Sequence, residues 1–440
     1  MKPRPPSRSR EGAVAILRDV LRHGAEATPL LAARGAGLSP PDRDLLRELV
    51  LGVLRHRSAL DAELASVCRA PLARLAPGLR EILEVALYQL RHLDRVPGYA
   101  AVDEAVRQAR AGGGERAAKL VNAVLRKLAD RPRPAPAAVL STAELARDTS
   151  HPEFLVRRWV ERFGRETACR ILEADNAHSG LDLLANPRRT DRDRLREALA
   201  LEGVESELSP LSPLGLSVVS GNPLGSPLLG EGHFTVQDVG AQALALLLPP
   251  GDLLVDLAAA PGGKSFAALA LGRAKRTVSL DRSPARLRRF AENARRLGMP
   301  EARAAAADFL APPLPAAKFD RVLLDAPCSG TGTLRKIPEI RYRLTPTAIS
   351  KLAGSQAQAV AAAAALLAPG GYLLYATCSL EVEENEEVVA KVLSARPDLK
   401  VSPIDAPPLL RPYVDGGRFR ILPDARTDGF TAHLIARRGT

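Results

Sequence analysis

Aromatic side chains make up only 4% of the 440 residues, and cysteine occurs just four times, at Cys68, Cys169, Cys328 and Cys378. So few aromatic rings argue against an affinity that rests mainly on stacking with nucleic-acid bases. No two cysteines have C-x-x-C spacing, which argues against a structural zinc site or a disulfide framework. We therefore expect reduced thiols and no bound metal ion.

Long hydrophobic runs are also missing. No stretch of about 18 apolar residues occurs, as a membrane-spanning helix would need. The basic start, residues 1–10, is not followed by the apolar segment of a signal peptide. We predict a cytoplasmic protein with no membrane partner, whose residues 1–10 form a disordered basic tip.

The overall composition is that of a folded protein with a basic surface. Hydrophobic residues are 46% and charged residues 25%, and the length suggests about three domains. The 62 Lys and Arg outnumber the 50 Asp and Glu. This excess favours a polyanionic partner such as nucleic acid, or an anionic membrane surface, although an Arg-rich composition alone can make a chain basic.

Residues 11–130 have the apolar spacing of amphipathic helices, and no alternating strand pattern interrupts them. Pro and Gly stand where helices should stop, most clearly at Pro97-Gly98 and at residues 112–114. Over residues 1–130, 22 Lys and Arg stand against 15 Asp and Glu, an excess that could face phosphates. We predict an all-helical domain.

Residues 131–141 are rich in proline, which cannot continue a helix, and we expect a linker there. Residues 142–235 begin with a helical stretch near His151-Pro152 and continue into a segment rich in Ser, Pro, Gly and Leu. We predict that they form a small α/β adaptor domain.

From residue 236 to 440, short apolar runs alternate with helical stretches. Runs at 253–256, 277–281, 303–307, 321–325 and 371–376 are the expected strands. Strands separated by helices predict a mostly parallel sheet covered on both faces, an α/β Rossmann-like domain. Ligands of such sheets bind outside the carboxyl ends of the strands, and three of these runs end in Asp.

The first strand runs into Asp256-Leu-Ala-Ala-Ala-Pro-Gly-Gly-Lys264, a turn of small residues that lets backbone approach a ligand. It matches neither G-x-G-x-x-G nor the phosphate-binding P-loop. Asp281 ends the next strand, where a carboxylate can accept from ribose hydroxyls, and Asp308 follows the third strand. The alternative is that these aspartates are only helix N-caps.

This loop resembles the S-adenosylmethionine loop of the RNA 5-methylcytosine methyltransferases, with Ala258 where the family usually has Cys. The resemblance implies that Asp281 holds the ribose and that Asp308 faces the adenine amine. It implies S-adenosyl-L-methionine as cofactor. The loop and the other cofactor-binding positions are then Ala258, Ala259, Ala260, Pro261, Gly262, Gly263, Lys264, Asp281, Asp308 and Asp325.

Two cysteines follow neighbouring strands, in Asp325-Ala-Pro-Cys328 and in Ala376-Thr-Cys378. A lone Cys is more often an inert buried residue, which is our reading of Cys68 and Cys169. Methylation of cytosine at carbon 5 needs a thiolate that adds to carbon 6 and an acid at the ring nitrogen. The resemblance implies that Cys378 is the nucleophile, that Cys328 promotes product release, and that Asp325 contacts the cytosine ring.

Three basic residues near these motifs allow two interpretations each. Lys264 could be a functional residue, which binds phosphate or donates within the active-site loop, or it could be a solvated lysine at a helix start. Arg335 and Lys336 could contact RNA phosphates or be ordinary surface charges.

Further motifs are similar to the same family. Gln237-Asp238 resembles the segment that packs beside the methionine site, and Asp428-Gly-Phe430 resembles a closing motif in which Thr431 replaces a second Phe. Residues 99–106 and 120–126 resemble helices of the antitermination factor NusB. A NusB-like domain joined to this catalytic domain is typical of the RsmB/NOP methyltransferase family.

The resemblance implies a monomeric enzyme that methylates carbon 5 of one cytosine in 16S ribosomal RNA, free or at an early stage of assembly. One alternative is the same chemistry on transfer RNA or another RNA. A second alternative is an antitermination-type RNA-binding protein without catalysis, against which the intact Asp325, Cys328 and Cys378 argue.

Overall fold

The structure is a computed structural model that describes residues 7–132 and 140–439. The chain divides into two compact units. The first comprises Met1–Ala177 and Leu334–Leu344, and the second comprises His178–Thr333 and Thr345–Thr440. Among the described residues, no helix is both long and apolar enough to cross a membrane.

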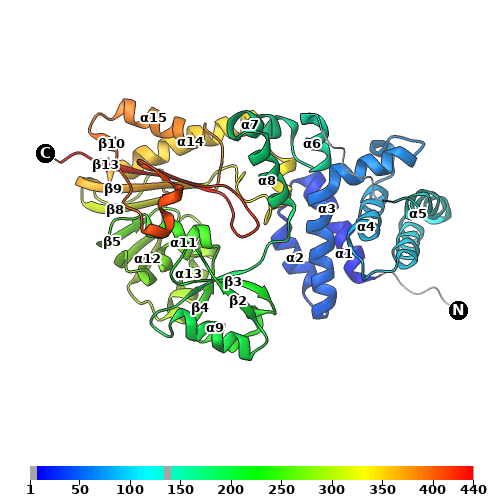
Figure 1. The fold of residues 1–440 in the computed structure, drawn as a ribbon, viewed down its shortest axis with the longest axis horizontal. Helices are drawn as coiled ribbons and strands as arrows, with labels where there is room; N and C mark the ends of the chain where they lie inside the picture. The colour runs from blue at the N-terminus through cyan, green and yellow to red at the C-terminus, as the bar shows by residue number, and fades with distance from the viewer. Residues whose placement is uncertain (1–6, 133–139, 440) are drawn as a thin grey trace. The chain divides into compact units, whose positions relative to one another are not determined.

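The first unit contains only helices within its described residues, as predicted for its N-terminal part (Figure 1). These are α1 (Arg8–His23), α2 (Ala27–Gly35), α3 (Pro40–Val67), η1 (Leu72–Arg74), α4 (Leu79–His92), α5 (Gly98–Ala129), α6 (Thr142–Asp148), α7 (Glu153–Phe163), α8 (Arg165–Asn176) and η3 (Pro338–Tyr342).

Local sequence explains where these helices begin and bend. Ser39 caps α3 by accepting from the Asp42 amide, and two prolines fill the first turn of that helix. Inside α5, Gly114 has φ +70° and ψ −169°, which breaks the helix at the predicted Gly-Gly-Gly position. Buried residues such as Leu49 and Leu83 pack α1, α3, α4 and α5 around one core.

The short segment Leu334–Leu344 packs into the first unit, although the sequence analysis placed it in the domain of residues 236–440. The Arg341 guanidinium donates to the carbonyl of Asp175 (2.8 Å) and to the side-chain oxygen of Asn176 (2.7 Å). Arg335 is only 3% exposed, so it is neither an ordinary surface charge nor a free phosphate contact. The sequence does not predict this burial, because basic residues after a Gly-rich stretch usually lie on the surface.

The second unit contains a four-stranded antiparallel sheet in the order β2-β3-β1-β4. Its strands are β1 (Asp182–Ala185), β2 (Glu205–Leu208), β3 (Gly215–Ser220) and β4 (Phe234–Val236), and α9 (Arg192–Leu201) packs on it through Leu195 and Leu199. The chain enters α10 (Pro227–Gly230) before β4.

The larger sheet has nine strands, and its central part is parallel, which confirms the predicted fold class. The strand order is β11-β12-β13-β9-β8-β5-β6-β7, with β10 beside β13. Its strands are β5 (Gly251–Asp256), β6 (Ala274–Asp281), β7 (Ala302–Ala306), β8 (Phe319–Asp325), β9 (Leu367–Thr377), β10 (Leu399–Val401), β11 (Val414–Asp415), β12 (Arg418–Ile421) and β13 (Phe430–Arg437). Only the strands from β10 on pair antiparallel.

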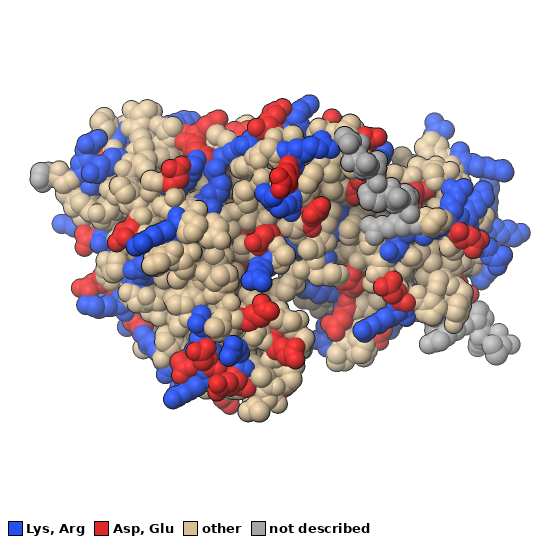
Figure 2. Space-filling view, in the orientation of Figure 1, with Lys and Arg blue, Asp and Glu red and all other residues tan. Residues whose placement is uncertain are grey.

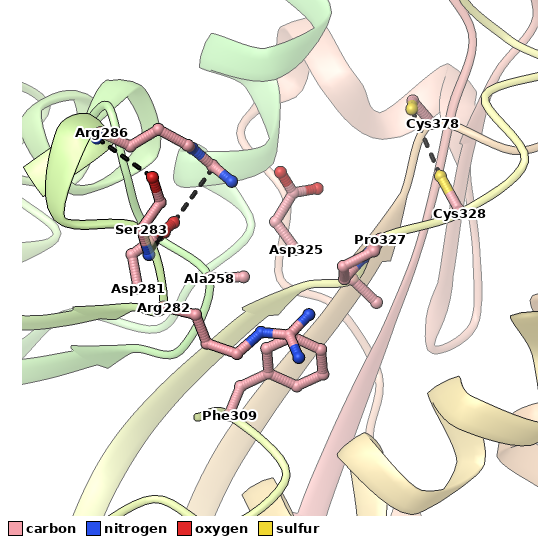
Figure 3. A pocket seen from close by; sticks show the side chains of 11 residues that line it. Ala258, Asp281, Arg282, Ser283, Arg286, Phe309, Asp325, Pro327, Cys328 and Cys378 are labelled. Carbon is pink, nitrogen blue, oxygen red and sulfur yellow. Dashed lines mark hydrogen bonds and ion pairs between the residues drawn. The ribbon is translucent and has the colours of Figure 1, made fainter. Parts of the chain in front are cut away.

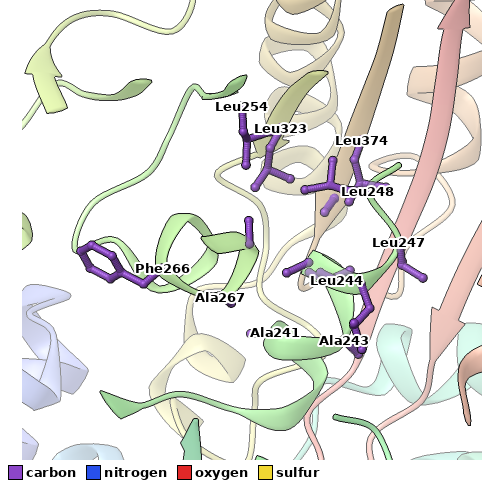
Figure 4. Close-up of a cluster of buried hydrophobic side chains, with 14 of the residues drawn as sticks. Ala241, Ala243, Leu244, Leu247, Leu248, Leu254, Phe266, Ala267, Leu323 and Leu374 are labelled. Carbon is purple, nitrogen blue, oxygen red and sulfur yellow. The ribbon is translucent and has the colours of Figure 1, made fainter. Parts of the chain in front are cut away.

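Helices cover both faces of this sheet, and successive strand residues alternate between the two cores. Leu254, Leu323 and Leu374 join one core, drawn in Figure 4, while their neighbours Val255 and Leu324 join the other. The first core includes α11 (Val239–Leu246), α12 (Gly263–Ala270) and α13 (Pro284–Leu297). The second includes α14 (Pro346–Ala365) and α15 (Glu386–Ala395), and η4 (Pro408–Tyr413) follows β10.

One predicted boundary differs from the structure. Helix α1 begins at Arg8, so residues 8–10 are not part of a disordered tip, while residues 1–6 lie outside the described residues. Residues 142–235, the predicted adaptor, comprise α6, α7 and α8, which pack in the first unit, and β1–β4, which pack in the second. The adaptor's first helices bury Leu155 and Trp159, a pattern that does not reveal which neighbour they cover. Most of the predicted linker, residues 133–139, also lies outside the described residues.

Candidate active site

The site lies where the strand order of the larger sheet reverses. From β5 the chain proceeds to β6 and β7 on one side, and then to β8 and β9 on the other. The loops after β5 and β8 therefore border a crevice at the carboxyl ends of the strands, where ligands of open α/β sheets bind. Asp256, Asp281 and Asp325 end β5, β6 and β8, and Cys378 follows β9.

A cavity of about 480 Å³ opens at this edge (Figure 3). It contains both predicted catalytic cysteines and two of the predicted acidic residues, at one end of the sheet. It is lined by Ala258, Asp281, Arg282, Ser283, Arg286, Phe309, Asp325, Ala326, Pro327, Cys328 and Cys378.

Asp281 is held rigidly in this cavity. One carboxylate oxygen accepts from the Ser283 amide (2.8 Å) and the other from the Ala260 amide (3.2 Å). Arg286 forms an ion pair with the same carboxylate at 3.1 Å. The carboxylate is thus fixed in direction at the strand end, as a group that accepts from two hydroxyls of a ribose must be.

The small-residue loop after β5 lies against the end of β6. The Ala259 amide donates to the Leu280 carbonyl at 2.9 Å, and the peptide bond between Ala260 and Pro261 is cis. Gly262 has φ +109°, and a Cβ there would lie 2.2 Å from the Phe266 ring, so only glycine fits. This loop then starts α12, whose first turn presents amide donors.

The cavity takes in only part of the predicted cofactor-binding set. Ala258 lines it, whereas Ala259, Ala260, Pro261, Gly262 and Gly263 lie in the loop behind that wall. Asp308 does not line the cavity. The residue after it, Phe309, does, with Arg282 stacked 5.3 Å over the ring and 3.9 Å from the Asp308 carboxylate.

Lys264 contacts a predicted catalytic residue. Its ammonium lies 2.5 Å from an oxygen of Asp325, and both side chains are mostly buried. Burial opposes the charge on Lys264, but the negative charges of Asp325, Cys378 and Asp256 outweigh it and raise the pKa of the lysine. Of the two interpretations of Lys264, donation within the site fits this geometry and a solvated lysine does not.

The two predicted catalytic thiols are neighbours. The Sγ atoms of Cys328 and Cys378 are 3.3 Å apart, so one thiol can donate to the other. This hydrogen bond, followed by burial, raises the pKa of Cys328 well above its usual value, and the charges of Glu384 and Asp325 add to the effect.

Asp256, at the start of the small-residue loop after β5, is only 1% exposed. One of its oxygens accepts from the Ser265 hydroxyl at 2.7 Å, and Ser265 in turn lies 2.8 Å from the Ser279 hydroxyl. Burial raises the pKa of Asp256 to about 6, although Ser265 and Lys264 partly oppose this. The residue orders the loop rather than facing the cavity, because it is absent from the cavity lining.

The closing motif near residue 430 also reaches the cysteine loops. The Gly332 amide donates to the Cys378 carbonyl (2.9 Å), and the Gly429 amide donates to the Gly332 carbonyl (2.7 Å). Thr431, which replaces the family's second Phe, is fully buried and donates to the Ser379 carbonyl at 3.1 Å. Residue 431 therefore holds the loop after Cys378 and has no surface on which to stack.

Three residues at or near the site were not predicted from the sequence: Arg282, Arg286 and Glu384. The two arginines belong to the Asp-Arg-Ser-Pro turn after β6 and the helix that it starts, where basic residues are common on the surface. Glu384 lies beneath both cysteines, and the signal that could have revealed it is the Cys-Ser pair repeated at 328–329 and 378–379.

The surroundings of Gln237 show whether this edge of the sheet can hold S-adenosylmethionine. Its side chain is 8% exposed and packs against Gly263, where an added Cβ would lie 3.4 Å from the Gln237 amide nitrogen. Neither amide atom of Gln237 has a hydrogen-bond partner among the described residues. A polar ligand group beside the loop would satisfy them, as the methionine end of the cofactor requires. The residues therefore fit the cofactor.

The parallel sheet, the loop after β5 and the fixed Asp281 together define an S-adenosylmethionine-dependent methyltransferase of the Rossmann-like class. Comparisons with known proteins identify it further. Family models match for "16S rRNA methyltransferase RsmB/F" over residues 243–435, for the NusB family over 7–130, and for the ferredoxin-like domain of RsmF/B-like methyltransferases over 151–224.

Relatives match over nearly the whole length. A probable ribosomal RNA small subunit methyltransferase B of Bacillus subtilis is 33% identical, covering 91% of this chain and 92% of the relative. Another from Synechocystis is 34% identical, covering 96% and 98%. A crystal structure of a methyltransferase homologue from Pyrococcus horikoshii is 26% identical with a TM-score of 0.56, covering 68% and 100%. The chain belongs to the RsmB/F family of RNA methyltransferases, with a NusB-like N-terminal domain.

Proposed function

We propose that the protein methylates carbon 5 of a cytosine in small-subunit ribosomal RNA, through a covalent bond from Cys378. The observation that carries the chemistry is the pair of thiols 3.3 Å apart, in one cavity with Asp325 and the cofactor loop. The names of the relatives from Bacillus subtilis and Synechocystis support the substrate.

The reaction begins with addition to the base. Carbon 5 of cytosine is a poor nucleophile until a thiolate adds to carbon 6, which moves the ring electrons toward the ring nitrogen and carbon 5. Cys378 suits this step, because it lines the cavity and lies 3.3 Å from Cys328, whose raised pKa keeps it a thiol that can donate to the attacking sulfur. The thiolate form of Cys378 is the attacking species.

Asp325 and Lys264 act on the cytosine ring. Asp325 accepts from the Lys264 ammonium at 2.5 Å, and its carboxylate oxygens can also accept from the exocyclic amine of the base. Lys264 is the proton donor beside that carboxylate and can relay a proton toward the ring nitrogen as charge develops there. We therefore assign Lys264 a role in proton transfer to the base as well as in the cofactor loop.

Release requires the reverse of addition. When bound, S-adenosylmethionine supplies a methyl group on a positively charged sulfur, which the activated carbon 5 accepts. A base, such as a water molecule in the cavity, must then take the proton from carbon 5, so that the double bond between carbons 5 and 6 re-forms and Cys378 leaves as a thiolate. Cys328, adjacent to Cys378, is the residue we assign to this release step, because its thiol can donate to the departing sulfur.

We assign the cofactor positions from the same geometry. The loop from Ala258 to Lys264, with Gln237 behind it, takes the methionine end, and Asp281 takes the ribose. The adenine then lies toward Phe309 and Arg282, with Asp308 at the edge of that site. Asp325 borders both the cofactor and the base.

The first unit supplies positive charge for an RNA backbone. Figure 2 shows Lys and Arg side chains gathered over α4 and α5 on the face drawn. Exposed basic residues of α5 include Arg110, Arg116, Lys119, Arg126 and Lys127. We propose that residues 11–130 bind the ribosomal RNA by phosphate contacts, and that the protein acts as a cytoplasmic monomer on free or early-assembly 16S RNA.

The test is transfer of labelled methyl from S-adenosylmethionine to unmodified 16S RNA, with the product mapped by mass spectrometry. We expect a single 5-methylcytosine with the wild type and none with Cys378→Ala. Methylation of bulk transfer RNA instead would favour the alternative substrate. RNA binding without methyl transfer to either RNA would favour the alternative of a non-catalytic, antitermination-type protein.

A further inference from the structure

Glu384 lies buried beneath the two cysteine loops, with no exposed surface. One carboxylate oxygen accepts from the Ser329 amide (2.8 Å) and from the Gln356 side chain (2.9 Å). The other accepts from the Ser329 hydroxyl and from the Ser379 hydroxyl, the latter at 2.5 Å. Its acceptor positions are thus occupied by four donors from three segments of the chain.

Three of these four donors come from the two residues that directly follow the cysteines. Ser329 follows Cys328 after β8, and Ser379 follows Cys378 after β9. The two serine hydroxyls are also 3.2 Å from each other. A single carboxylate that does not line the cavity therefore ties together the chain segments that carry the two thiols.

We propose that Glu384 is a positioning residue that fixes the spacing of Cys328 and Cys378. A buried carboxylate costs free energy unless its hydrogen bonds are satisfied, and four donors satisfy them here. Three of these hydrogen bonds link Ser329 and Ser379 through the one carboxylate. Glu384 touches neither cofactor nor base, because it does not line the cavity.

Several charged or titratable groups face Cys328, and their balance follows from their positions. Cys378, Glu384 and Asp325 place negative charge near it, and Tyr375, which donates to the Glu384 carbonyl, lies close by. The Lys264 ammonium instead faces Asp325 and Cys378. Negative charge on Cys328 is therefore disfavoured by Glu384, and Cys378 is the thiol with a cation in its surroundings.

This inference rests on the proposed function only for its kinetic consequence, because thiol reactivity is measured without RNA. The probe is iodoacetamide, and mass spectrometry of the Cys328 peptide gives its alkylation rate against pH in the full-length protein. In Glu384→Gln, which keeps the shape and removes the charge, the pH midpoint of Cys328 alkylation should fall by about one unit or more. Methyl transfer should lose about tenfold or more in kcat, with KM for S-adenosylmethionine little changed.

The matched control is Glu387→Gln, the same change at an exposed position at the start of α15, which should alter neither measurement. An unchanged Cys328 midpoint, or an unchanged kcat, in Glu384→Gln would overturn the proposal. If the wild type methylates no RNA, the proposed function fails while the alkylation profile still decides whether Glu384 controls Cys328.

A second variant covers the case in which Glu384→Gln does not fold, which a thermal unfolding scan would show. Ser379→Ala removes the bond to the Cys378 loop and leaves the carboxylate in place. We expect kcat to fall by about tenfold, because the spacing of the two thiols is lost while the carboxylate remains. Wild-type kcat in Ser379→Ala would show that this link does not set the spacing.

Discussion

The Lys264 ammonium meets the Asp325 carboxylate at 2.5 Å, at the point where the cofactor loop and the Cys328 loop converge. The two residues are 61 positions apart in the sequence. Lys264 lies in the helix after β5, and Asp325 is the last residue of β8. Because each parallel strand ends at the same edge of the sheet, the fold makes this contact without any local sequence signal. It joins the predicted cofactor site to the predicted base-binding residue.

Replacing Lys264 with Met should therefore impair catalysis more than folding. The change keeps most of the aliphatic stem and removes the ammonium, which leaves Asp325 without its cation and Cys378 without a neighbouring positive charge. We expect methyl transfer to fall by about a hundredfold or more in kcat, the usual cost of losing a charged group at a reacting centre.

The matched control is Lys275→Met. Lys275 also pairs with an aspartate, Asp252 at 2.7 Å, but both side chains are largely exposed. Exposed ion pairs contribute little, so we expect activity close to that of the wild type. Equal losses in the two variants would argue that Lys264 has no special role.

The order of the two cysteines can be tested by trapping. In Cys328→Ala the Cys378 thiolate should still add to the base, but release should slow, so that a covalent protein–RNA adduct accumulates. Denaturing gel electrophoresis with labelled RNA would show it as a shifted band. Cys169→Ala, at a half-buried cysteine remote in sequence, is the control and should give no adduct. An adduct in Cys378→Ala and not in Cys328→Ala would reverse our assignment.

The sequence predicted the strands and helices of the catalytic domain well, for a physical reason. Apolar runs such as Leu253–Val255, ended by Asp and followed by small residues, encode both a buried parallel strand and the turn after it. Position at a strand end then placed Asp281, Asp325, Cys328 and Cys378 at one edge, and the structure brings all four into one cavity.

Contacts between distant segments could not be predicted in the same way. Nothing local marks Glu384 as the acceptor for Ser329 and Ser379, because a run of acidic residues before a helix usually indicates a solvated surface. Arg335 is a similar case, since only the packing of the first unit decides that it is buried. Periodicity reports which face of an element is buried, but it does not report the partner.

Asp256 should make stability depend on pH in a recognisable direction. Burial raises its pKa to about 6 from an ordinary 3.8, so the folded state favours the protonated form. The stability that this contributes is fully present below about pH 4 and is lost as the pH rises through about 6. Over that range the shift corresponds to about 3 kcal/mol.

Asp256→Asn keeps an acceptor for the Ser265 hydroxyl and removes the titration. We expect the free energy of unfolding of the wild type, minus that of the variant, to fall by about 3 kcal/mol from about pH 4 to about pH 7. Urea denaturation at each pH measures it. Asp252→Asn, at the exposed start of the same strand, is the control and should leave the pH dependence nearly unchanged. A difference that stays flat would show that Asp256 titrates normally.

Arg341 holds the segment Leu334–Leu344 in the first unit. Its guanidinium is buried and donates to the carbonyls of Arg55 (3.1 Å) and Asp175 (2.8 Å) and to the Asn176 side chain (2.7 Å). Burial lowers the pKa of Arg341 to about 10, although the negative charge of Asp175 acts to raise it. Arg341 therefore remains a cation at neutral pH. Arg341→Met would leave these buried oxygens without their donor, at a cost of about 3 kcal/mol.

Hydrogen exchange measured by mass spectrometry localises that loss. Amides of α3 and α8 that exchange through opening of the first unit should do so roughly a hundredfold faster in Arg341→Met, because their protection reflects the free energy of that opening. Arg343→Met, two residues away at an exposed position, should exchange like the wild type, since its one bond, to the Gly24 carbonyl at 3.2 Å, is exposed. Unchanged protection of α3 and α8 in Arg341→Met would mean that the segment is held by its apolar contacts, such as that of Tyr342 with the helical core, and that the buried cation is dispensable for stability.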